Sequence, residues 1–173
     1  MNINFGPRGI LQLDNVRITH RNFEGRASKY NREGDRNFSV IIPNQFIIDI
    51  CDDPDIPDGV TVADYLADLG WNLKKKPPRE EGEGEFIFLP VKINMNGRTN
   101  VYLQSGRKMV KLDEDTIGII DNLEIEECDL DIRPYDWHVN GKEGRAAYLQ
   151  SMKVVQRVDR FSEEFDDMNG ILE

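Results

Sequence analysis

The sequence contains few of the residues from which metal and redox sites are built. Its 173 residues include two cysteines, Cys51 and Cys128, and two histidines, His20 and His138. The cysteines lie far apart and lack the CxxC spacing, so we expect two small, unreactive thiols rather than a disulfide or a zinc site. The sequence therefore predicts neither a cofactor nor a bound metal ion.

Apolar runs are short as well. No stretch approaches the roughly 20 apolar residues that are needed to span a bilayer. The start, MNINFGPRGIL, has neither the basic opening nor the apolar run of a secretory signal. With 39% apolar and 31% charged residues, the composition is typical of one soluble, cytosolic domain with a modest core and a highly charged surface.

Motifs of common enzyme classes are also missing. The chain has no GxxxxGKS/T phosphate loop, no HExxH and no GxSxG. Asp129 and Asp131 share one face of an expected strand, with Glu127 nearby, and a magnesium-dependent nuclease would need such a group of carboxylates. Acids that alternate with core residues also form ordinary solvated strand faces. No catalytic residue is assigned, and a nuclease remains an alternative.

The acidic residues are concentrated in three segments, although the whole chain has a formal charge of -10. Residues 49–68 carry seven acids, residues 113–131 carry nine, and residues 159–173 carry six. Together these segments hold 22 of the 32 acids and one of the 22 bases. The rest of the chain is therefore basic, and the acidic total does not exclude a polyanion as a ligand.

Alternation of apolar and polar residues, which is typical of strands, dominates the chain. Strands are predicted at 15–19, 37–42, 85–95, 99–104, 124–133 and 146–155. One helix is expected between a cap at Thr61 and a stop at Gly70, with a shorter helical turn around 45–50. Five or six strands with one inserted helix predict a mainly β fold, either a small barrel or a sandwich.

Several local features accompany these strands. Asn140-Gly141 is typical of a hairpin turn. The pair Glu126-Glu127 fits a β-bulge, and Pro90 indicates an edge strand or a bulge. Residues 74–85, KKKPPREEGEGE, are interpreted as a polar loop, and Trp71 is expected in the core.

The segment from His20 to Phe38, HRNFEGRASKYNREGDRNF, combines six basic side chains with three aromatic rings. A single nucleic-acid strand presents phosphates and exposed base faces, so a binder that does not read sequence needs cations and rings. Phe23 and Tyr30 have no apolar neighbours and are expected to be exposed. Phe38 begins a strand and fits the core as well as the surface. A charged hairpin loop without a ligand is the alternative.

Three other segments repeat this combination of cations and rings, at the end of the helix, around Tyr102, and around the expected hairpin. We expect the four patches to line one groove. The candidate nucleic-acid-binding residues are Arg17, Arg21, Phe23, Arg26, Lys29, Tyr30, Arg32, Arg36, Lys74, Lys75, Lys76, Arg79, Tyr102, Arg107, Lys108, Arg133, Tyr135, Trp137, Lys142 and Arg145.

Four blocks within residues 15–155 carry a further signal: NVRITHRNFEGRASKYNREGDRNFSVII, LADLGWNLKKKPPRE, YLQSGRKMVKLDEDTIG and DLDIRPYDWHVNGKEGRAAYLQSM. The residues of these blocks, and the order of the blocks along the chain, resemble a family of bacteriophage single-stranded DNA-binding proteins. The resemblance implies an oligonucleotide/oligosaccharide-binding (OB) barrel in which the RASKYNREGDRNF, SGRK and RPYDWHVNGK blocks frame the DNA. The chain departs from the pattern in an acidic insertion at 44–60 and at His20, where an aromatic residue fits better.

The resemblance implies a non-enzymatic protein that binds single-stranded DNA without strong sequence preference, in replication, recombination or repair, in the cytoplasm of the bacterial host. We expect an OB-like domain at residues 1–158 and a flexible acidic tail at 159–173 that contacts replication or recombination proteins. The apolar residues of this tail are Phe161, Phe165, Ile171 and Leu172. A structural or adaptor protein of the phage is a second alternative. No membrane contact is expected, and the oligomeric state is left open.

Overall fold

The computed structural model describes residues 1–82 and 84–161, which are mainly β-strand. Ten strands form one sheet in this part of the chain, so the mainly β class is confirmed but the number of strands exceeds the five or six expected. The strands are β1 (Asn2–Phe5), β2 (Leu11–Asp14), β3 (Ile18–Asn22), β4 (Arg36–Ile41), β5 (Lys74–Lys76), β6 (Phe86–Ile93), β7 (Asn100–Ser105), β8 (Lys108–Leu112), β9 (Ile125–Val139) and β10 (Lys142–Gln156). The helical elements are η1 (Pro7–Gly9), η2 (Ile47–Asp49), α1 (Val62–Asp68) and η3 (Ile117–Asn122). None of the helices described has the length and apolarity to cross a membrane.

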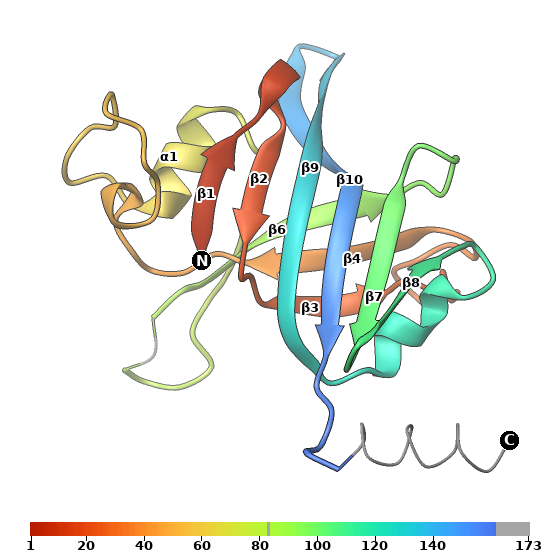
Figure 1. Ribbon diagram of the computed structural model, residues 1–173. Helices are drawn as coiled ribbons and strands as arrows, with labels where there is room; N and C mark the ends of the chain where they lie inside the picture. Colours follow the sequence, from red (N-terminus) through yellow and green to blue (C-terminus); the bar gives the residue numbers. More distant parts are fainter. Residues whose placement is uncertain (83, 162–173) are drawn as a thin grey trace, which may run out of the picture.

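Strand β10 lies at the centre of the sheet. One side pairs along its length with antiparallel β9, and the other side pairs in parallel first with β6 and then with β7. The sheet follows the order β1-β2-β9-β10-β6-β4-β3, with β5 added to β6 and β8 added to β7. In Figure 1, β9, β10 and β7 cross in front of β6, β4 and β3. The end strands β1 and β3 are not paired with each other among the described residues, so the sheet is open.

The core lies between these two crossing layers. In the rear layer, Phe38 and Val40 of β4 and Leu89 and Val91 of β6 are fully or almost fully buried. The front layer contributes Leu130, Ile132, Leu149, Met152 and Val154. Because every second residue of a strand points to the same face, the residues between these core positions point outward. The outer face of β4, β6, β10 and β9 is therefore available for function.

The long hairpin of β9 and β10 extends this outer face beyond the core. Its turn is formed by Asn140 and Gly141, whose φ angles of 52° and 76° are typical of the predicted two-residue turn. Near the other end, Val155 is opposite Glu127 whereas Gln156 is opposite Ile125, so Glu126 is an extra residue and the predicted bulge is confirmed. A second register shift leaves Gln150 unpaired, close to the point where the neighbour of β10 changes from β6 to β7.

The predicted helix and its caps are confirmed. The Thr61 hydroxyl accepts a hydrogen bond from the Asp64 N–H at 3.2 Å, and Gly70 follows the helix with a φ of 95°. Trp71, predicted to be a core residue, is 3% exposed. The helical turn expected around 45–50 is η2. These elements belong to an acidic segment that lies beside β1 (Figure 1).

Several strand predictions were incomplete or wrong. Residues 74–76 form β5, which pairs with β6, and are not part of a loop. The short strands β1, β2 and β8 were not predicted; β1 and β2 have four residues each, which gives too short an alternation. The strand predicted at 15–19 is β3, which begins only at Ile18. Pro90 lies in an inner strand, opposite Ser39 of β4. On the other side of β6, the neighbouring strand changes from β5 to β10 at Pro90. A residue without an N–H costs least at such a point, because no ladder hydrogen bond is lost there.

Candidate nucleic-acid interface

A row of polar and aromatic side chains crosses the outer face of four adjacent strands. Lys92 of β6 is opposite Asn37 of β4 on one side and Tyr148 of β10 on the other. Tyr148 is in turn opposite Arg133 of β9. Directly opposite residues point to the same face of a sheet, and the residues that flank this row along the strands are largely buried. The row therefore places a cation on each side of one aromatic ring.

The ring of Tyr148 is held at the centre of this row. The Lys92 ammonium group lies 5.9 Å from the ring centroid and the Arg133 guanidinium group 5.7 Å from it. Tyr135, which is 59% exposed, meets Tyr148 edge-on at a centroid distance of 5.8 Å. Cation–π contacts of this kind attract the two cations to the ring. Both cations remain at the surface, where a phosphate can reach them.

A hollow of about 490 Å³ lies next to the row. Its lining contains lysines and aromatic residues and no acid. The lining residues are Asn72, Lys74, Pro90, Lys92, Tyr135, Trp137, Ala146, Ala147 and Tyr148. Phosphates favour the cations, and base faces favour the rings. We call this hollow, together with Arg133, the aromatic groove.

Trp137 is oriented by a glycine on the neighbouring strand. Gly144 is opposite Trp137, and a Cβ atom added at Gly144 would lie 2.7 Å from Cζ2 of the indole ring. Because atoms cannot approach so closely, only glycine at this position lets the ring rest on the β10 backbone. The hairpin thus presents the ring at one end of the aromatic groove.

A second, more basic hollow continues from Arg133. It has a volume of about 320 Å³ and is lined by Arg8, Asn96, Arg98, Thr99, Asn100, Arg133, Leu149, Gln150 and Ser151. Arg8 comes from η1 and Arg98 from the loop between β6 and β7. Arg133 takes part in both surfaces. The cationic surface therefore extends past the edge of the aromatic groove.

The loop between β3 and β4 carries the most exposed aromatic ring of the described residues. Tyr30 is 89% exposed, and the Lys29 ammonium group lies 5.7 Å from its centroid. Asn31 organises this loop, because its Nδ2 donates to the carbonyls of Arg26, Arg32 and Asp35 at 2.9–3.0 Å. Its Oδ1 accepts from Asn37 Nδ2 at 2.8 Å. Asn37 belongs to the cross-strand row, so the loop is tied to the same face as the aromatic groove.

Replacing Asn31 with alanine is expected to weaken oligonucleotide binding by about 1 kcal/mol, roughly fivefold, because the loop loses the bonds that orient Tyr30. Fluorescence anisotropy with a labelled oligothymidylate measures this effect. Asn44→Ala, at an exposed asparagine of the acidic segment, is the matched control. In the Asn31→Ala background, a further Tyr30→Ala change should cost less than it does in the wild type. Equal costs in both backgrounds would contradict the positioning role.

The structure corrects the prediction that Phe23 is exposed. Its side chain is 0% exposed and stacks on Phe38 at a centroid distance of 5.0 Å. Phe38 is therefore also a core residue. Neither ring can stack on a base while the fold is intact. Tyr30 is exposed as predicted, and its contact with DNA remains a prediction.

Three candidate arginines are engaged within the protein. The Arg21 guanidinium group donates to the carbonyls of Ile120 and Leu123 at 2.9 and 2.6 Å. Arg36 donates to the carbonyls of Phe23 and Glu114 at 2.8 and 3.1 Å. Arg145 pairs with Asp136 at 2.7 Å and lies over the Trp71 ring at 5.5 Å. These contacts explain the local structure, and they make the three side chains weaker candidates for phosphate contacts.

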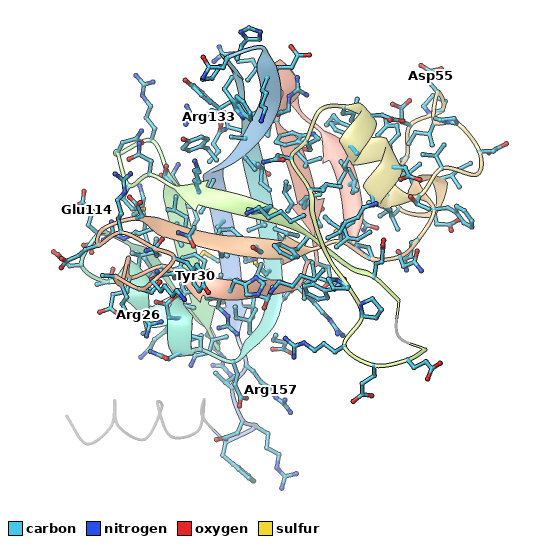
Figure 2. All side chains as sticks on the ribbon, turned by 180° about the vertical axis from the view of Figure 1, so that it is seen from behind. Arg26, Tyr30, Asp55, Glu114, Arg133 and Arg157 are labelled. Carbon is cyan, nitrogen blue, oxygen red and sulfur yellow. The ribbon has the colours of Figure 1, made fainter. Side chains whose placement is uncertain are left out.

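The other candidates are distributed over several surfaces. Arg26 lies 3.7 Å from both Glu24 and Asp121, and Arg32 lies 3.4 Å from Asp35. Tyr102 of β7 is opposite Lys153 and Lys111 rather than next to the aromatic groove. The remaining exposed candidates are Lys75, Lys76, Arg79, Arg107, Lys108 and Lys142. Figure 2 shows Arg26 and Tyr30 beside β3 and β4, with Arg133 above them and Asp55 on the opposite side.

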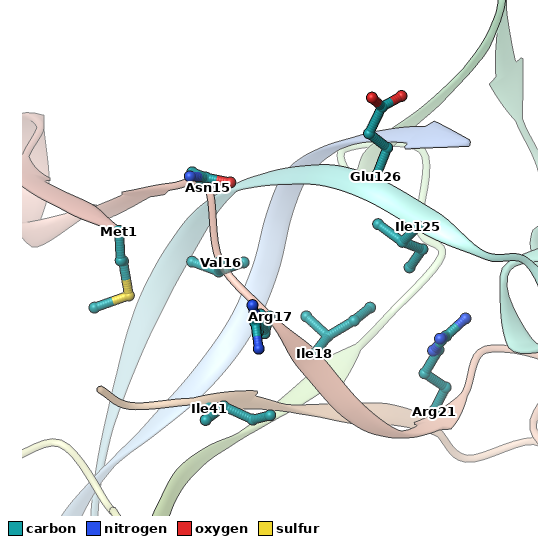
Figure 3. Close-up of a pocket in the computed structure, with 9 residues that line it drawn as sticks. All are labelled: Met1, Asn15, Val16, Arg17, Ile18, Arg21, Ile41, Ile125 and Glu126. Carbon is teal, nitrogen blue, oxygen red and sulfur yellow. The ribbon is translucent and has the colours of Figure 1, made fainter. Parts of the chain in front are cut away.

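Another hollow, of about 630 Å³, is larger than the aromatic groove but a poorer candidate. Figure 3 shows its lining, in which Arg17 is accompanied by Arg21, the acid Glu126 and several aliphatic residues. The lining contains no aromatic ring, and the Arg21 guanidinium group is already bonded to two carbonyls. Arg17 is exposed there, but no ring beside it could stack on a base.

The outer face of β9 is acidic in the first half of the strand, whereas its second half belongs to the candidate interface. Glu127, Asp129 and Asp131 precede Arg133 on this face of β9. Partial burial, followed by the nearby Asp14 carboxylate, raises the pKa of Asp131 above its ordinary value. An Asp129 oxygen accepts a hydrogen bond from the Asn15 N–H at 2.8 Å. Within residues 1–82 and 84–161, no group of three or more potential ligands could hold a metal ion. This acidic half would repel a phosphate backbone and therefore limits the interface.

The comparison with known families agrees with this geometry. Residues 4–171 match a family model described as "Putative phage ssDNA-binding domain". The chain belongs to this family. The match confirms the predicted family and its single-stranded DNA-binding function, and it gives no support to the nuclease alternative.

Solved structures resemble this phage single-stranded DNA-binding domain in fold. The single-stranded DNA-binding protein from bacteriophage Enc34 is 15% identical, with a TM-score of 0.55 over 95% of this chain and 94% of that chain. Its C-terminal truncation is 13% identical, with a TM-score of 0.54 over 91% and 92%. The Enc34 protein in complex with ssDNA is 17% identical, with a TM-score of 0.49 over 91% of each chain. No curated protein sequence matches the chain.

Four residues of the candidate interface in this phage DNA-binding domain are absent from the candidates chosen from the sequence. They are Lys92, Arg8, Arg98 and Tyr148, and all four line the two hollows. Tyr148 directly follows the segment of cations and rings around the hairpin, but it was not chosen. Lys92 and Tyr148 lie at outward positions of strands that were predicted, so the alternation itself contains a signal for them. Arg8 and Arg98 lie outside the basic segments and give no comparable signal.

The predicted tail falls largely outside the described residues. Phe161 is 54% exposed, and the Arg160 guanidinium group lies 4.5 Å from its ring centroid. Phe165, Ile171 and Leu172 lie outside the residues that the structure describes. The domain boundary at residue 158 and the role of the tail remain predictions.

Proposed function

We propose that a single DNA strand crosses the outer face of β6, β10 and β9 within the aromatic groove. Lys92, Arg133 and Lys74 contact its phosphates, while Tyr148, Tyr135 and Trp137 stack on its bases. The observation that carries this proposal is the row Lys92, Tyr148 and Arg133, in which two cations flank one ring on adjacent strands. Arg8 and Arg98 extend the phosphate contacts, and Lys29 and Tyr30 extend the interface at the other end.

This arrangement supports binding with little sequence preference. Every base has a face that can stack, and every nucleotide has a phosphate, so rings and cations do not distinguish between bases. A stacked base contributes on the order of 1–3 kcal/mol. The acids of the first half of β9 oppose a backbone that runs toward β7. The strand is therefore directed from the aromatic groove toward Arg98 and Arg8.

The biological role that we propose is protection of single-stranded DNA during phage replication, recombination or repair in the cytoplasm of the bacterial host. The protein acts by binding and does not cleave the strand. The acidic tail at 159–173 contacts replication or recombination proteins through Phe161, Phe165, Ile171 and Leu172. The family match and the fold shared with the Enc34 single-stranded DNA-binding protein support this role.

Titration with an oligothymidylate at several salt concentrations tests the proposed path. Affinity for a single strand falls with salt in proportion to the phosphates neutralised, by a slope of about 0.7 per contact. Lys92→Ala and Arg133→Ala should each lower the slope by about that amount. The matched control is Lys153→Ala, because Lys153 is exposed on the same strand as Tyr148 but lies opposite Asp129.

Three results would contradict the proposal. Lys153→Ala could lower the salt slope as much as Lys92→Ala does, which would place the strand elsewhere on the sheet. Duplex DNA could bind as tightly as the single strand, which would remove the role of stacking. Shortening of the oligonucleotide in the presence of Mg²⁺ would show that the protein cleaves its ligand.

A further inference from the structure

The side chain of His20, in β3, lies against side chains of β5 and β6. The Nε2 atom of His20 lies 3.4 Å from the Lys76 ammonium nitrogen. The imidazole ring meets the Phe88 ring edge-on at a centroid distance of 5.2 Å, and the same ammonium group lies 5.7 Å from the Phe88 centroid. His20 has a φ of 50°, a backbone conformation that is uncommon outside glycine. Its side chain is therefore held against Lys76 and Phe88.

Positive charge is concentrated at this point. Partial burial, then Lys76, then Arg79 lowers the pKa of His20 below its ordinary value. Phe88 of β6 adds no charge, and no ion pair of Lys76 or Arg79 with an acid occurs among the described residues. In the free protein the partial burial and the two cations thus disfavour the charged form of the imidazole. Such a group of donors is suited to an anion.

The cluster adjoins the aromatic groove. Lys74 lines the groove and lies opposite Phe88 in the register between β5 and β6. Phe88 in turn contacts both His20 and Lys76. The surface of β5 therefore leads from the groove to the cluster without an intervening acidic residue, since β5 consists of three lysines.

We propose that His20, Lys76 and Arg79 form an additional site for a DNA phosphate, and that His20 takes up a proton when the phosphate binds. The proposal rests on the proposed function, because the phosphate belongs to the same strand. A phosphate between the three groups replaces repulsion with attraction, so the imidazolium form becomes favourable. By linkage, the protein then binds DNA more tightly as the pH falls.

The first test is the pH dependence of oligothymidylate affinity between about pH 8 and about pH 5.5, the range in which a histidine titrates. Thymine is chosen as the only base so that no base of the ligand titrates in this range. In the wild type, affinity should rise as the pH falls, approaching tenfold per pH unit for one proton taken up. His20→Asn should remove most of this rise, and asparagine tolerates the positive φ.

The matched control is His138→Asn, at the other histidine of the chain, which should retain the pH dependence. An equal rise in the His20→Asn protein would overturn the inference while leaving the proposed function intact. Failure of the wild type to bind oligothymidylate at any pH would instead overturn the proposed function.

A second measurement does not depend on a variant. The imidazole resonances of His20, followed by NMR during a pH titration, report its pKa with and without oligothymidylate. The pKa should rise when the DNA is bound. An unchanged or lower pKa in the complex would overturn the proposal.

Discussion

Replacing Phe23 with alanine is expected to lower the free energy of unfolding by about 3–5 kcal/mol. The side chain is 0% exposed, and its ring stacks on Phe38 with an interplanar angle of 12°. Removing it leaves a cavity between the two layers of the sheet. Since domains are stabilised by about 5–15 kcal/mol in total, this loss is a large part of the stability. Urea denaturation followed by circular dichroism measures it.

Tyr30→Ala is the matched control, because it removes an aromatic ring from the same basic segment. Tyr30 is 89% exposed, so its loss should change stability by less than about 0.5 kcal/mol and should affect DNA binding instead. The two variants therefore separate a core ring from a surface ring. A Phe23→Ala protein with wild-type stability and weakened DNA binding would contradict the burial of Phe23.

The contrast between these two rings shows where sequence reasoning reached its limit. Phe23 has polar neighbours on both sides, and an exposed ring is the natural interpretation of such a segment. Its burial depends on a long-range contact, in which the Asp121 carboxylate accepts hydrogen bonds from the N–H groups of Phe23 and Glu24 at 2.7 and 3.2 Å. Nothing within residues 20–38 indicates that η3 supplies this partner.

Features that depend on neighbouring residues were predicted well. The Asn140-Gly141 turn, the Thr61 cap and the bulge at Glu126 each follow from the chemistry of two or three adjacent residues. The strands β4, β6, β7, β9 and β10 were each predicted, at least in part, from the alternation of their residues. Local signals of this kind are strong because the backbone conformation is decided by the residue itself.

The arrangement of the interface could not be predicted in the same way. Lys92, Tyr148 and Arg133 come together because β10 pairs in parallel with β6 and antiparallel with β9. Parallel pairing joins segments that are distant in sequence, and a shift of one residue would turn every side chain to the other face. The sequence segments therefore indicated that aromatic rings and cations bind DNA. The register of the strands determines which of these side chains lie next to one another.

Trp137→Ala is expected to weaken oligothymidylate binding by about 1–3 kcal/mol, roughly 5- to 150-fold, because one stacking surface is lost. The slope of affinity against salt should stay close to that of the wild type, since no cation is removed. Trp137→Phe should retain most of the affinity. Fluorescence anisotropy at two salt concentrations measures both quantities, and an unchanged affinity in Trp137→Ala would contradict contact between this ring and the DNA.

The intrinsic fluorescence of the protein gives an independent result for the same ring. The chain has two tryptophans, and Trp71 is 3% exposed beneath the Arg145 guanidinium group. Quenching on DNA binding should therefore come from Trp137 and disappear in Trp137→Phe while affinity is retained.

Gly144→Ala provides the complementary variant, because the new methyl group would push the indole ring away from the β10 backbone. It should weaken binding without removing any group that contacts DNA, and wild-type affinity in this variant would mean that the orientation of Trp137 is not important for stacking.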